Sequence, residues 1–478
     1  MDLQCDLAQQ GSPLPHCWEH TIGSCHAPLA LRADWQEQLR RCHAELGFRY
    51  VRFHGLLSDD VGTVVRHNNR LIYSFFNCDR IVDFLLSIGM RPFVELSFMP
   101  TALASGAKTV FHYRGNVTPP RDYQQWSTLI ERLVRHWVDR YGAREVGQWF
   151  FEVWNEPNLK AFWTGSRRHY FTLYRHTIRA IKGVNANLQV GGPATAHDEW
   201  IEEFVDYCER YDLPADFIST HHYPTDALIS PGTDTETQLA HSRRSIMRQW
   251  AQDTKRRAGR RPLYYTEWNA SSNPRDPLHD QPYAAAFIAK AALEASGIAD
   301  GYSFWTFSDL FEENYFPSVP FHGGFGLLTV QGIAKPAYRA FQLLHALGGE
   351  RLMADGLHHT IDAWVTRKSR DVTIVLTNHA LPRHPIRRER VRITLQNSHR
   401  PRAVSIQRID DSHANAGKAW RAMGSPEYLS PRMVARLDAA STLDETPCSW
   451  KYARRTTTID IALPPYGLAA VGVRFGAH

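Results

Sequence analysis

The chain has 478 residues, of which 43% are hydrophobic and 22% charged, so it can bury a large core, is long enough for more than one domain, and is not expected to be disordered. Its formal charge of +6 comes mostly from arginine. The arginine clusters at 255–261 and 387–392 lack the interleaved aromatic residues of a nucleic acid reading module. We therefore predict solvated surfaces there and no nucleic acid partner.

The remaining composition argues against a membrane protein, a disulfide framework and a metal centre. No apolar run approaches the roughly 20 residues of a membrane helix, and Met1 is followed by Asp2, not by a basic and apolar leader. The seven cysteines are scattered, without a close CxxC pair, which favours reduced thiols in a cytoplasmic protein. The sequence has no HExxH motif and no Cys/His quartet, and we expect His358 and His359 to face opposite ways on a strand. The prediction is therefore no membrane partner, no metal and no cofactor.

From about residue 20 to residue 348, short apolar runs alternate with longer amphipathic stretches, which is typical of βα units. Eight repeats, without a Gly-rich phosphate loop after the first, predict a closed (β/α)8 TIM barrel of the α/β class and not an open doubly wound sheet. The expected strands are 21–25, 50–55, 91–98, 149–154, 188–192, 217–221, 263–267 and 302–307. The expected helices include 79–88, 123–141, 170–183 and 284–295.

After residue 350 the helical pattern stops and short alternating segments follow, which predicts an accessory C-terminal β-sandwich. Its expected strands are 360–365, 372–377, 391–395, 404–409, 457–463 and 469–475. Residues 411–456 are Ser/Ala-rich, and we expect a long loop there with one helix at most.

Two of the barrel strands end in a glutamate. Residues 149–158, WFFEVWNEPN, form an apolar run that leads to Glu156, and residues 263–269, LYYTEWN, lead to Glu267. A buried strand normally excludes ionisable groups, so carboxylates at its end need a partner or a reaction. Because the C-terminal ends of barrel strands converge, the two glutamates are expected to face each other, an arrangement that suggests glycoside hydrolysis.

The same segment resembles the signature of glycoside hydrolase family 39 of clan A, which contains β-xylosidases and α-L-iduronidases. The residues that carry the resemblance are Trp149, Glu152, Trp154, Asn155, Glu156, Pro157 and Asn158. Three further segments, GFRYVRFHGLLSDD (47–60), PFVELSFMP (92–100) and FWTFSDLFEE (304–313), resemble the bacterial β-xylosidase branch, and the matches keep their order from about residue 18 to about residue 340.

The resemblance implies a cofactor-free, retaining exo-glycosidase that releases terminal β-D-xylosyl residues from small xylo-oligosaccharides in xylan degradation. It assigns Glu156 as acid/base and Glu267 as nucleophile. It also implies that the first 17 residues join the β-sandwich. The predicted domains are thus an N-terminal segment 1–17, a catalytic barrel 18–348 and an accessory sandwich 349–478.

Side chains near the two glutamates fit this division of roles. Asn155 can donate a hydrogen bond to the sugar 2-hydroxyl, and Arg52, at the end of the second strand, offers Glu267 a cationic neighbour. Strand alternation places His221 and Tyr223 on one side. The resemblance puts Tyr223 beside the nucleophile and His221 near the sugar, although a core histidine with a satisfied hydrogen bond is the alternative.

The resemblance also implies that His54, which shares strand parity with Arg52, contacts the sugar. Trp305 is either the apolar floor under a pyranose ring or barrel packing. At least one of Glu312 and Glu313 is implied to accept hydrogen bonds from sugar hydroxyls, and the choice between them stays open. Glu95 and Glu152 lie inside strands, where we expect them to position neighbouring side chains.

One residue departs from the family pattern. In the segment 23–27 the family usually shows a second glycine where this chain has Cys25, so the sequence does not define the size of the sugar pocket beside this residue. A reactive-cysteine role for Cys25 lacks an identifiable activating base. Other glycosides, namely arabinopyranosides, glucosides and iduronides, stay as alternatives, as does a non-catalytic carbohydrate-binding protein. An iduronidase would need cationic groups around the substrate carboxylate, and the strand-end segments contain no distinct motif of that kind. The sequence leaves the aglycone, the number of subsites and the oligomeric state open.

Overall fold

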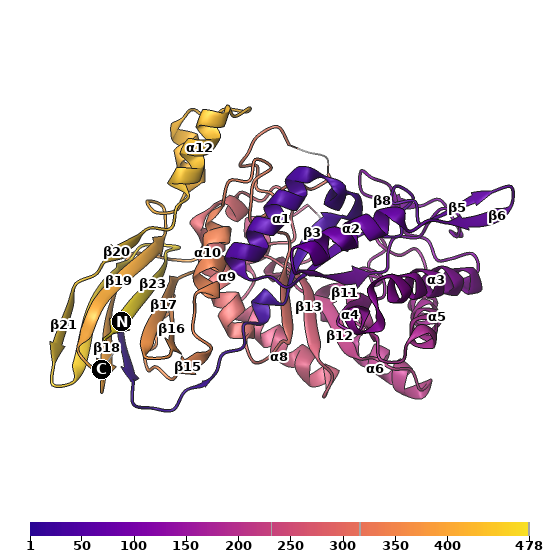
Figure 1. Ribbon diagram of the computed structural model, residues 1–478. Helices are drawn as coiled ribbons and strands as arrows, with labels where there is room; N and C mark the ends of the chain where they lie inside the picture. Colours follow the sequence, from indigo (N-terminus) through magenta and orange to yellow (C-terminus); the bar gives the residue numbers. More distant parts are fainter. Residues whose placement is uncertain (231, 315–316, 477–478) are drawn as a thin grey trace.

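A computed structural model describes residues 1–230, 232–314 and 317–476, and it contains the predicted barrel (Figure 1). Eight parallel strands close on themselves in the order β10-β11-β12-β13-β14-β3-β4-β7. Their bounds are β3 Thr21–His26, β4 Tyr50–His54, β7 Arg91–Glu95, β10 Phe150–Glu152, β11 Gln189–Thr195, β12 Phe217–His221, β13 Leu263–Trp268 and β14 Gly301–Phe304. The prediction of a (β/α)8 barrel is therefore confirmed.

Aromatic rings fill the N-terminal end of the barrel. Phe93, Phe150 and Phe217 form a buried cluster, and Tyr50 and Tyr264 pack against it. The rings of Phe93 and Phe150 stack with centroids 5.0 Å apart. Because this end is closed by apolar side chains, the polar residues of the strands gather at the opposite, C-terminal end, where barrel enzymes place their active sites.

Helices surround the barrel and bury aromatic and aliphatic side chains, as α3 and α5 illustrate. Helix α3 (Tyr123–Tyr141) has the predicted bounds and begins at Asp122, whose side chain accepts a hydrogen bond from the Gln124 amide. Helix α5 (Arg167–Val184) begins three residues earlier than predicted because Ser166 caps it. The others are α1 Ala33–Leu46, α2 Phe76–Ser87, α4 Ala143–Val146, α6 Ile201–Arg210, α7 Thr235–Ala240, α8 Ile246–Ala258, α9 Pro282–Ala295 and α10 Pro336–His345.

The C-terminal part forms two sheets that lie beside the barrel and share an apolar core of their own (Figure 1). One sheet has the order β1-β18-β22-β21 and the other β2-β15-β16-β17-β23-β19-β20. The N-terminal strand β1 pairs in parallel with β18, and β2 pairs with β15. The bounds are β1 Asp2–Asp6, β2 Ser12–Pro13, β15 Glu350–Leu352, β16 Ile361–Lys368, β17 Asp371–Asn378, β18 Glu389–Gln396, β19 Pro401–Ile409, β20 Glu445–Pro447, β21 Trp450–Ala453, β22 Thr456–Leu463 and β23 Leu468–Phe475.

Two local predictions about this part are wrong. Residues 411–456 contain two helices, α11 (Ala416–Ala422) and α12 (Pro431–Ala440), and two strands, because Asn415 and Ser430 cap helices that the mixed composition concealed. His358 and His359 precede β16 and are not on a strand. The ring Nδ1 of His358 accepts hydrogen bonds from the backbone of Thr360 and Ile361, which turns the chain there.

Two hairpins interrupt the βα pattern between β4 and α3: β5 (Val64–His67) with β6 (Arg70–Tyr73), and β8 (Thr109–Val110) with β9 (Gly115–Asn116). Neither was predicted, because their strands are short. Within the described residues, no helix has both the length and the apolar character that crossing a membrane requires.

Candidate active site

A cavity of about 310 Å³ opens at the C-terminal ends of the barrel strands. Its wall includes most of the side chains that the sequence singles out, and they lie at or after the ends of five strands, β4, β10, β12, β13 and β14. The predicted residues that line it are His54, Asn155, Glu156, Tyr223, Glu267, Trp305 and Glu313. The cavity therefore brings together residues that lie more than 250 positions apart in the sequence.

Arg52 is the hub beneath this cavity. Its guanidinium is fully buried on β4 and donates to Glu152 over 2.6 Å, to Glu267 over 2.8 Å and to the amide oxygen of Asn155 over 2.9 Å. It also lies 2.8 Å from Glu95. Burial lowers the pKa of Arg52, but the carboxylates of Glu152, Glu95 and Glu267 outweigh burial and raise it. The guanidinium thus stays charged, and Glu95 and Glu152 serve to hold it in place.

Both carboxyl oxygens of Glu267 accept hydrogen bonds. Oε1 accepts from Arg52, and Oε2 accepts from the phenol of Tyr223 over 2.9 Å. Burial, followed by the charges of Glu267 and Glu156, raises the pKa of Tyr223 well above its usual value, so the phenol keeps its proton and remains a donor. Two strong donors stabilise the ionised form of a carboxylate. Arg52 and Tyr223 therefore fix the orientation of Glu267, which also lines the cavity.

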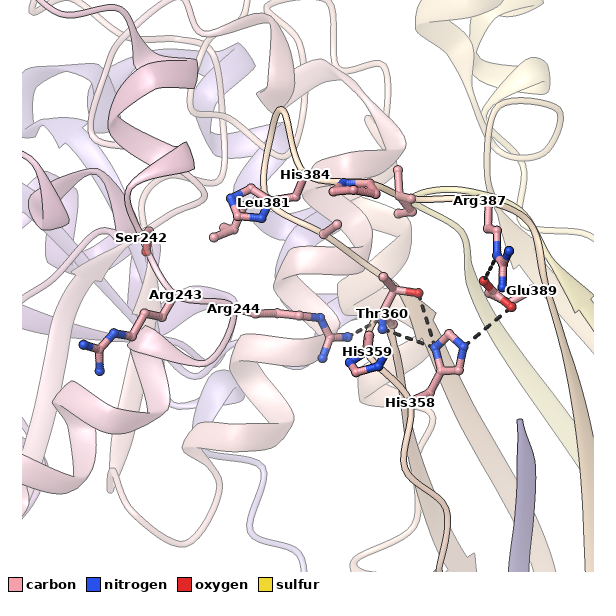
Figure 2. A pocket seen from close by; sticks show the side chains of 13 residues that line it. Ser242, Arg243, Arg244, His358, His359, Thr360, Leu381, His384, Arg387 and Glu389 are labelled. Carbon is pink, nitrogen blue, oxygen red and sulfur yellow. Dashed lines mark hydrogen bonds and ion pairs between the residues drawn. The ribbon is translucent and has the colours of Figure 1, made fainter.

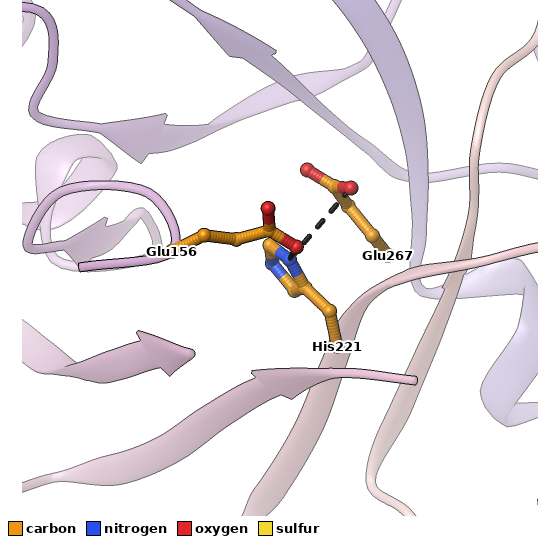
Figure 3. Close-up of side chains that lie close together, drawn as sticks. All are labelled: Glu156, His221 and Glu267. Carbon is orange, nitrogen blue, oxygen red and sulfur yellow. Dashed lines mark hydrogen bonds and ion pairs between the residues drawn. The ribbon is translucent and has the colours of Figure 1, made fainter. Parts of the chain in front are cut away.

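Glu156 has the opposite environment. It is buried in the segment that follows β10, and no lysine or arginine among the described residues forms an ion pair with it. Burial raises the pKa of Glu156 to about 7, against the opposing charges of His197, His54 and Arg52. Its Oε1 lies 2.9 Å from Nδ1 of His221 (Figure 3). The two glutamates therefore have different environments, because Glu267 is paired with a guanidinium and burial favours the protonated form of Glu156.

His221 and Tyr223 face the glutamates, whereas His222 faces away and hydrogen-bonds to Tyr302 over 2.9 Å. This agrees with the side alternation expected along β12. Burial lowers the pKa of His221 to about 4, so the imidazole is neutral at neutral pH. Its Nδ1 lies between the two carboxyls, 2.9 Å from Glu156 and 3.7 Å from Glu267.

The partners of Asn155 and His54 fix which of their atoms face the cavity. Arg52 can only donate, so the oxygen of Asn155 points to it and the amide NH2 is left for a ligand. In the same way Nδ1 of His54 is held by Glu95 at 2.7 Å, and Nε2 points towards the cavity, 3.6 Å from Glu313. Both side chains therefore present a defined polar atom to the space.

Trp305 lies in the cavity wall, next to His54, with ring centroids 4.7 Å apart. Trp305 also packs closely against β3, because a Cβ at Gly23 would lie 2.6 Å from its ring. Cys25, by contrast, does not line the cavity, and its sulfur accepts a hydrogen bond from the Glu312 amide. Burial raises the pKa of Cys25 well above its usual value, which does not favour a reactive thiolate.

The two glutamates after β14 have different surroundings. Glu313 lines the cavity, and its buried Oε1 has no hydrogen-bond partner among residues 1–230, 232–314 and 317–476. Burial and the negative charges of Glu267, Glu156 and Glu95 raise its pKa well above the usual value. Glu312 is outside the cavity wall and lies 3.2 Å from Nδ1 of His26. Of the two candidates, Glu313 is thus the one positioned to meet a ligand.

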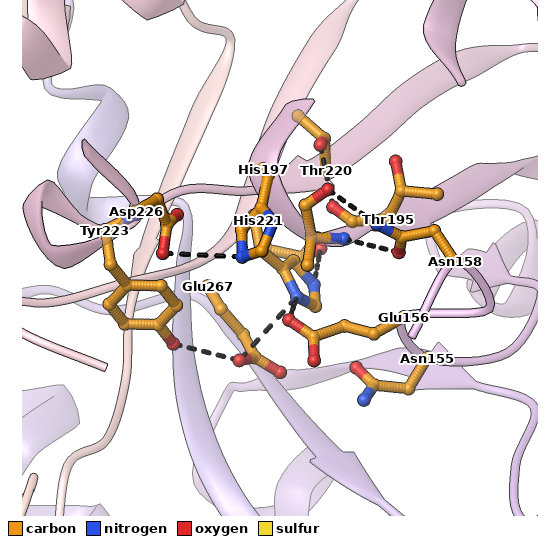
Figure 4. Close-up of polar contacts among 12 residues, drawn as sticks. Asn155, Glu156, Asn158, Thr195, His197, Thr220, His221, Tyr223, Asp226 and Glu267 are labelled. Carbon is orange, nitrogen blue, oxygen red and sulfur yellow. Dashed lines mark hydrogen bonds and ion pairs between the residues drawn. The ribbon is translucent and has the colours of Figure 1, made fainter. Parts of the chain in front are cut away.

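Sequence reasoning missed several residues of the wall, including His197, Asp226, Phe111 and Phe325. His197 follows β11 and lies 3.5 Å from Asp226 (Figure 4). The rule that active sites gather at the ends of barrel strands would have found His197. Phe111 belongs to the unpredicted β8–β9 hairpin and Phe325 to a long loop, and neither has a signal in the local pattern.

Glu156, His221 and Glu267 also form a group that could hold a metal ion, because one ligand atom from each lies within 4.8 Å of the others (Figure 3). The hydrogen bonds of this group to one another, to Arg52 and to Tyr223 account for the same short distances. The arrangement therefore does not require an ion.

A larger cavity, of about 730 Å³, lies between the barrel and the sandwich (Figure 2). It is lined by histidines and arginines such as His358, His384 and Arg244, and its one acidic lining residue is Glu389. Arg244 is already engaged by Asp362 and by the carbonyl of Thr360. Because a pair of facing carboxyls is absent from the described residues of its wall, this cavity lacks the chemistry of the smaller one.

Comparisons with known proteins agree with the fold and identify the family. The model of glycosyl hydrolases family 39 matches residues 1–457. A β-xylosidase of Caldicellulosiruptor saccharolyticus is 48% identical over 465 residues, which cover 96% of this chain and 95% of that protein. A β-xylosidase of Geobacillus stearothermophilus is 39% identical over 444 residues, covering 88% and 86%.

More distant relatives and solved structures agree with this picture. Human α-L-iduronidase is 25% identical over 505 residues, which cover 92% of this chain and 73% of that protein. The crystal structure of a monomeric β-xylosidase from Caulobacter crescentus CB15 aligns over the whole of both chains with 31% identity and a TM-score of 0.86. The chain is therefore a glycoside hydrolase and belongs to glycosyl hydrolases family 39.

Proposed function

We propose that this protein is a β-D-xylosidase that acts with retention of configuration, with Glu267 as nucleophile and Glu156 as acid/base. The observation that carries the proposal is the pair of carboxyls in one cavity, with an oxygen of each within 4.8 Å of the other and with opposite environments. Retaining enzymes hold their carboxyl groups roughly 5 to 5.5 Å apart, whereas inverting enzymes need about 6.5 to 9.5 Å to admit a water molecule. The close spacing supports retention.

In the first step Glu267 attacks the anomeric carbon, and the bond from that carbon to the leaving oxygen breaks. Glu156 gives its proton to the leaving oxygen, so the aglycone departs as an alcohol and Glu156 becomes ionised. In the second step Glu156 takes a proton from water, and the water oxygen attacks the same carbon. Glu267 is released as a carboxylate, and two inversions give net retention.

The neighbouring residues fit these steps. The free NH2 of Asn155 is positioned to donate to the sugar 2-hydroxyl, a hydrogen bond that strengthens in the oxocarbenium-like transition state. Arg52 and Tyr223 stabilise the charge that Glu267 carries before attack and regains on release. His54 and Glu313 offer polar atoms to the other hydroxyls, and Trp305 offers an apolar surface to the ring.

The assignment of xylose rests on the relatives named β-xylosidase and on the charge of the cavity wall. An iduronide carries a carboxylate that needs a cationic partner, and the described residues that line the cavity include no lysine or arginine. We infer that the substrates are the terminal β-D-xylosyl residues of small xylo-oligosaccharides, as in xylan degradation. Arabinopyranosides and glucosides are the second candidates, because they are uncharged as well.

The test is the initial rate on aryl β-D-xyloside, compared with aryl β-D-glucoside, α-L-arabinopyranoside and α-L-iduronide at matched concentrations. We expect the xyloside to be fastest and the first-formed sugar to be the β-anomer in the NMR spectrum. A faster rate on another glycoside would overturn the sugar assignment, and an α-anomer product would overturn retention. Turnover that survives Glu267→Gln would refute the nucleophile, and no turnover at all would favour a carbohydrate-binding protein.

We also propose a cytoplasmic location. All seven cysteines are free, and six of them are buried. Free cysteines are typical of reducing compartments.

A further inference from the structure

A continuous chain of hydrogen bonds runs below the cavity from Arg52 to Glu156. Arg52 donates to Oε2 of Glu152 over 2.6 Å, and Oε1 of Glu152 accepts from the hydroxyl of Thr266 over 2.8 Å. The Thr266 oxygen lies 3.1 Å from Nε2 of His221, whose Nδ1 lies 2.9 Å from Oε1 of Glu156. All five side chains are buried, and of the five only Glu156 lines the cavity.

The chain has a single direction. A carboxylate held by a guanidinium can only accept, so the one proton of the Thr266 hydroxyl points to Glu152. The Thr266 oxygen can then act towards His221 only as an acceptor, which requires the hydrogen of the imidazole to be on Nε2. Because the buried imidazole is neutral, its Nδ1 carries a bare lone pair. A contact of 2.9 Å between that lone pair and Glu156 needs a proton on Glu156.

We propose that Thr266 is a positioning residue that fixes the tautomer of His221, so that the bare Nδ1 of His221 accepts a hydrogen bond from protonated Glu156. The alternative tautomer, with hydrogen on Nδ1, would donate to Glu156 and stabilise its ionised form instead. Thr266 does not line the cavity, and its connection to Glu156 runs through His221. The inference rests on the proposed function, in which Glu156 is the acid/base.

The same direction serves both steps of the reaction. Before the first step it keeps the proton on Glu156, and after that step a bare lone pair faces the new carboxylate, which makes Glu156 a stronger base towards water. The series of hydrogen bonds also links Glu267 and Glu156. Arg52 donates directly to Glu267, and it orients His221 through Glu152 and Thr266. One buried cation thereby supports a charged nucleophile and a protonated acid at the same time.

Other charged groups also act on these residues and set the background for a test. Glu156 experiences His197, His54, Arg52 and Glu95 besides its burial, and His221 experiences Glu267, Arg52, Glu152 and His54. Tyr223 and Asp226, which follow β12, and Glu313, which follows β14, line the same cavity. The variant must therefore leave all of these groups in place and change only the hydroxyl.

Thr266→Val removes the hydroxyl at nearly constant volume, and Thr266→Ser is the matched control that keeps it. We expect the pH midpoint of the basic limb of kcat/KM on aryl β-D-xyloside to be about one unit lower in Thr266→Val than in the wild type. At about one pH unit above the wild-type midpoint, kcat/KM of the variant should then be about tenfold lower than that of the wild type. Thr266→Ser is expected to keep its limb at the wild-type pH. An unchanged limb in Thr266→Val, or an equal shift in both variants, would overturn the proposal.

A second measurement is independent of turnover. Nitrogen NMR of the protein with 15N-labelled histidine distinguishes the two neutral tautomers, and the His221 signal is identified by its loss in His221→Asn. We expect the hydrogen on Nε2 in the unaltered protein and a mixture of tautomers in Thr266→Val. Hydrogen on Nδ1 in the unaltered protein would refute the inference even if the enzyme proved to act on a different sugar, whereas failure on every glycoside with the expected tautomer would refute only the proposed function.

Discussion

Replacement of Arg52 by lysine tests whether the guanidinium is the hub of the site. The variant keeps the charge, but one ammonium replaces three nitrogens that reach Glu95, Glu152 and Glu267 within 2.6 to 2.8 Å and Asn155 as well. A single nitrogen cannot lie within hydrogen-bond distance of all four partners, so at least one buried carboxylate loses its cation. Breaking a buried pair costs about 3 to 5 kcal/mol. With an unfolding entropy of about 2.1 cal/mol/K per residue, the melting temperature of this chain should fall by about 3 to 5 °C.

Thermal unfolding followed by circular dichroism, together with kcat/KM on aryl β-D-xyloside, measures both effects. Loss of the contact to Glu267 should lower kcat/KM by about 10- to 150-fold, because hydrogen bonds to charged groups contribute roughly 1.5 to 3 kcal/mol. Arg91→Lys is the matched control, since Arg91 pairs through two nitrogens with Glu145 at a partly exposed position. It should cost less than about 1 kcal/mol. Equal losses of melting temperature and of kcat/KM in the two variants would show that the buried guanidinium of Arg52 has no special role.

Three further predictions concern single side chains, and one concerns metals. Burial raises the pKa of Glu156 to about 7, so the acid is protonated below that pH and kcat/KM should fall as the pH rises through it; a profile that is flat to pH 9 would contradict this. Tyr223→Phe removes one donor to the nucleophile and should lower kcat about 10- to 100-fold with an unchanged circular dichroism spectrum. Glu313→Gln should raise KM about tenfold or more, whereas Glu312→Gln should stay within about threefold, and the reverse order would exchange their roles. Dialysis against EDTA should leave the rate unchanged, and recovery only on adding a divalent cation would show that the Glu156 group holds an ion.

The barrel could be predicted because its signals are local and repeated. Each strand is a short apolar run, and the bounds of β12 and α3 agree with the prediction to the residue. Strand ends were less accurate, because apolar residues continue past the ends of β10 and β14, where Trp154 and Phe307 are fully buried without belonging to the strands. Burial and strand pairing are different properties, and only burial is visible in the composition.

The site was predictable where a residue ends a strand and not where a loop delivers it. Glu156 and Glu267 follow from the strand-end rule, and side alternation along β12 placed His221 correctly. Phe325 could not be found, because a tertiary network positions its loop: Lys335 donates to the carbonyl of Gly324 and pairs with Asp309 below it. Such tertiary contacts join segments that are distant in the sequence, so the pattern of a single segment does not predict them.

The pairing of the first strand has a consequence for synthesis on the ribosome. Asp2 lies opposite Arg392 in the ladder between β1 and β18, so the first strand waits for a partner that is made 390 residues later. At elongation rates of about 5 to 20 residues per second, this interval is roughly 20 to 80 seconds. All eight barrel strands are made during that time, so the barrel has the opportunity to close while the N-terminal segment still lacks its sheet. A chaperone or a fused tag that occupies residues 2–6 would therefore act on a sheet of the C-terminal part and not on the catalytic centre.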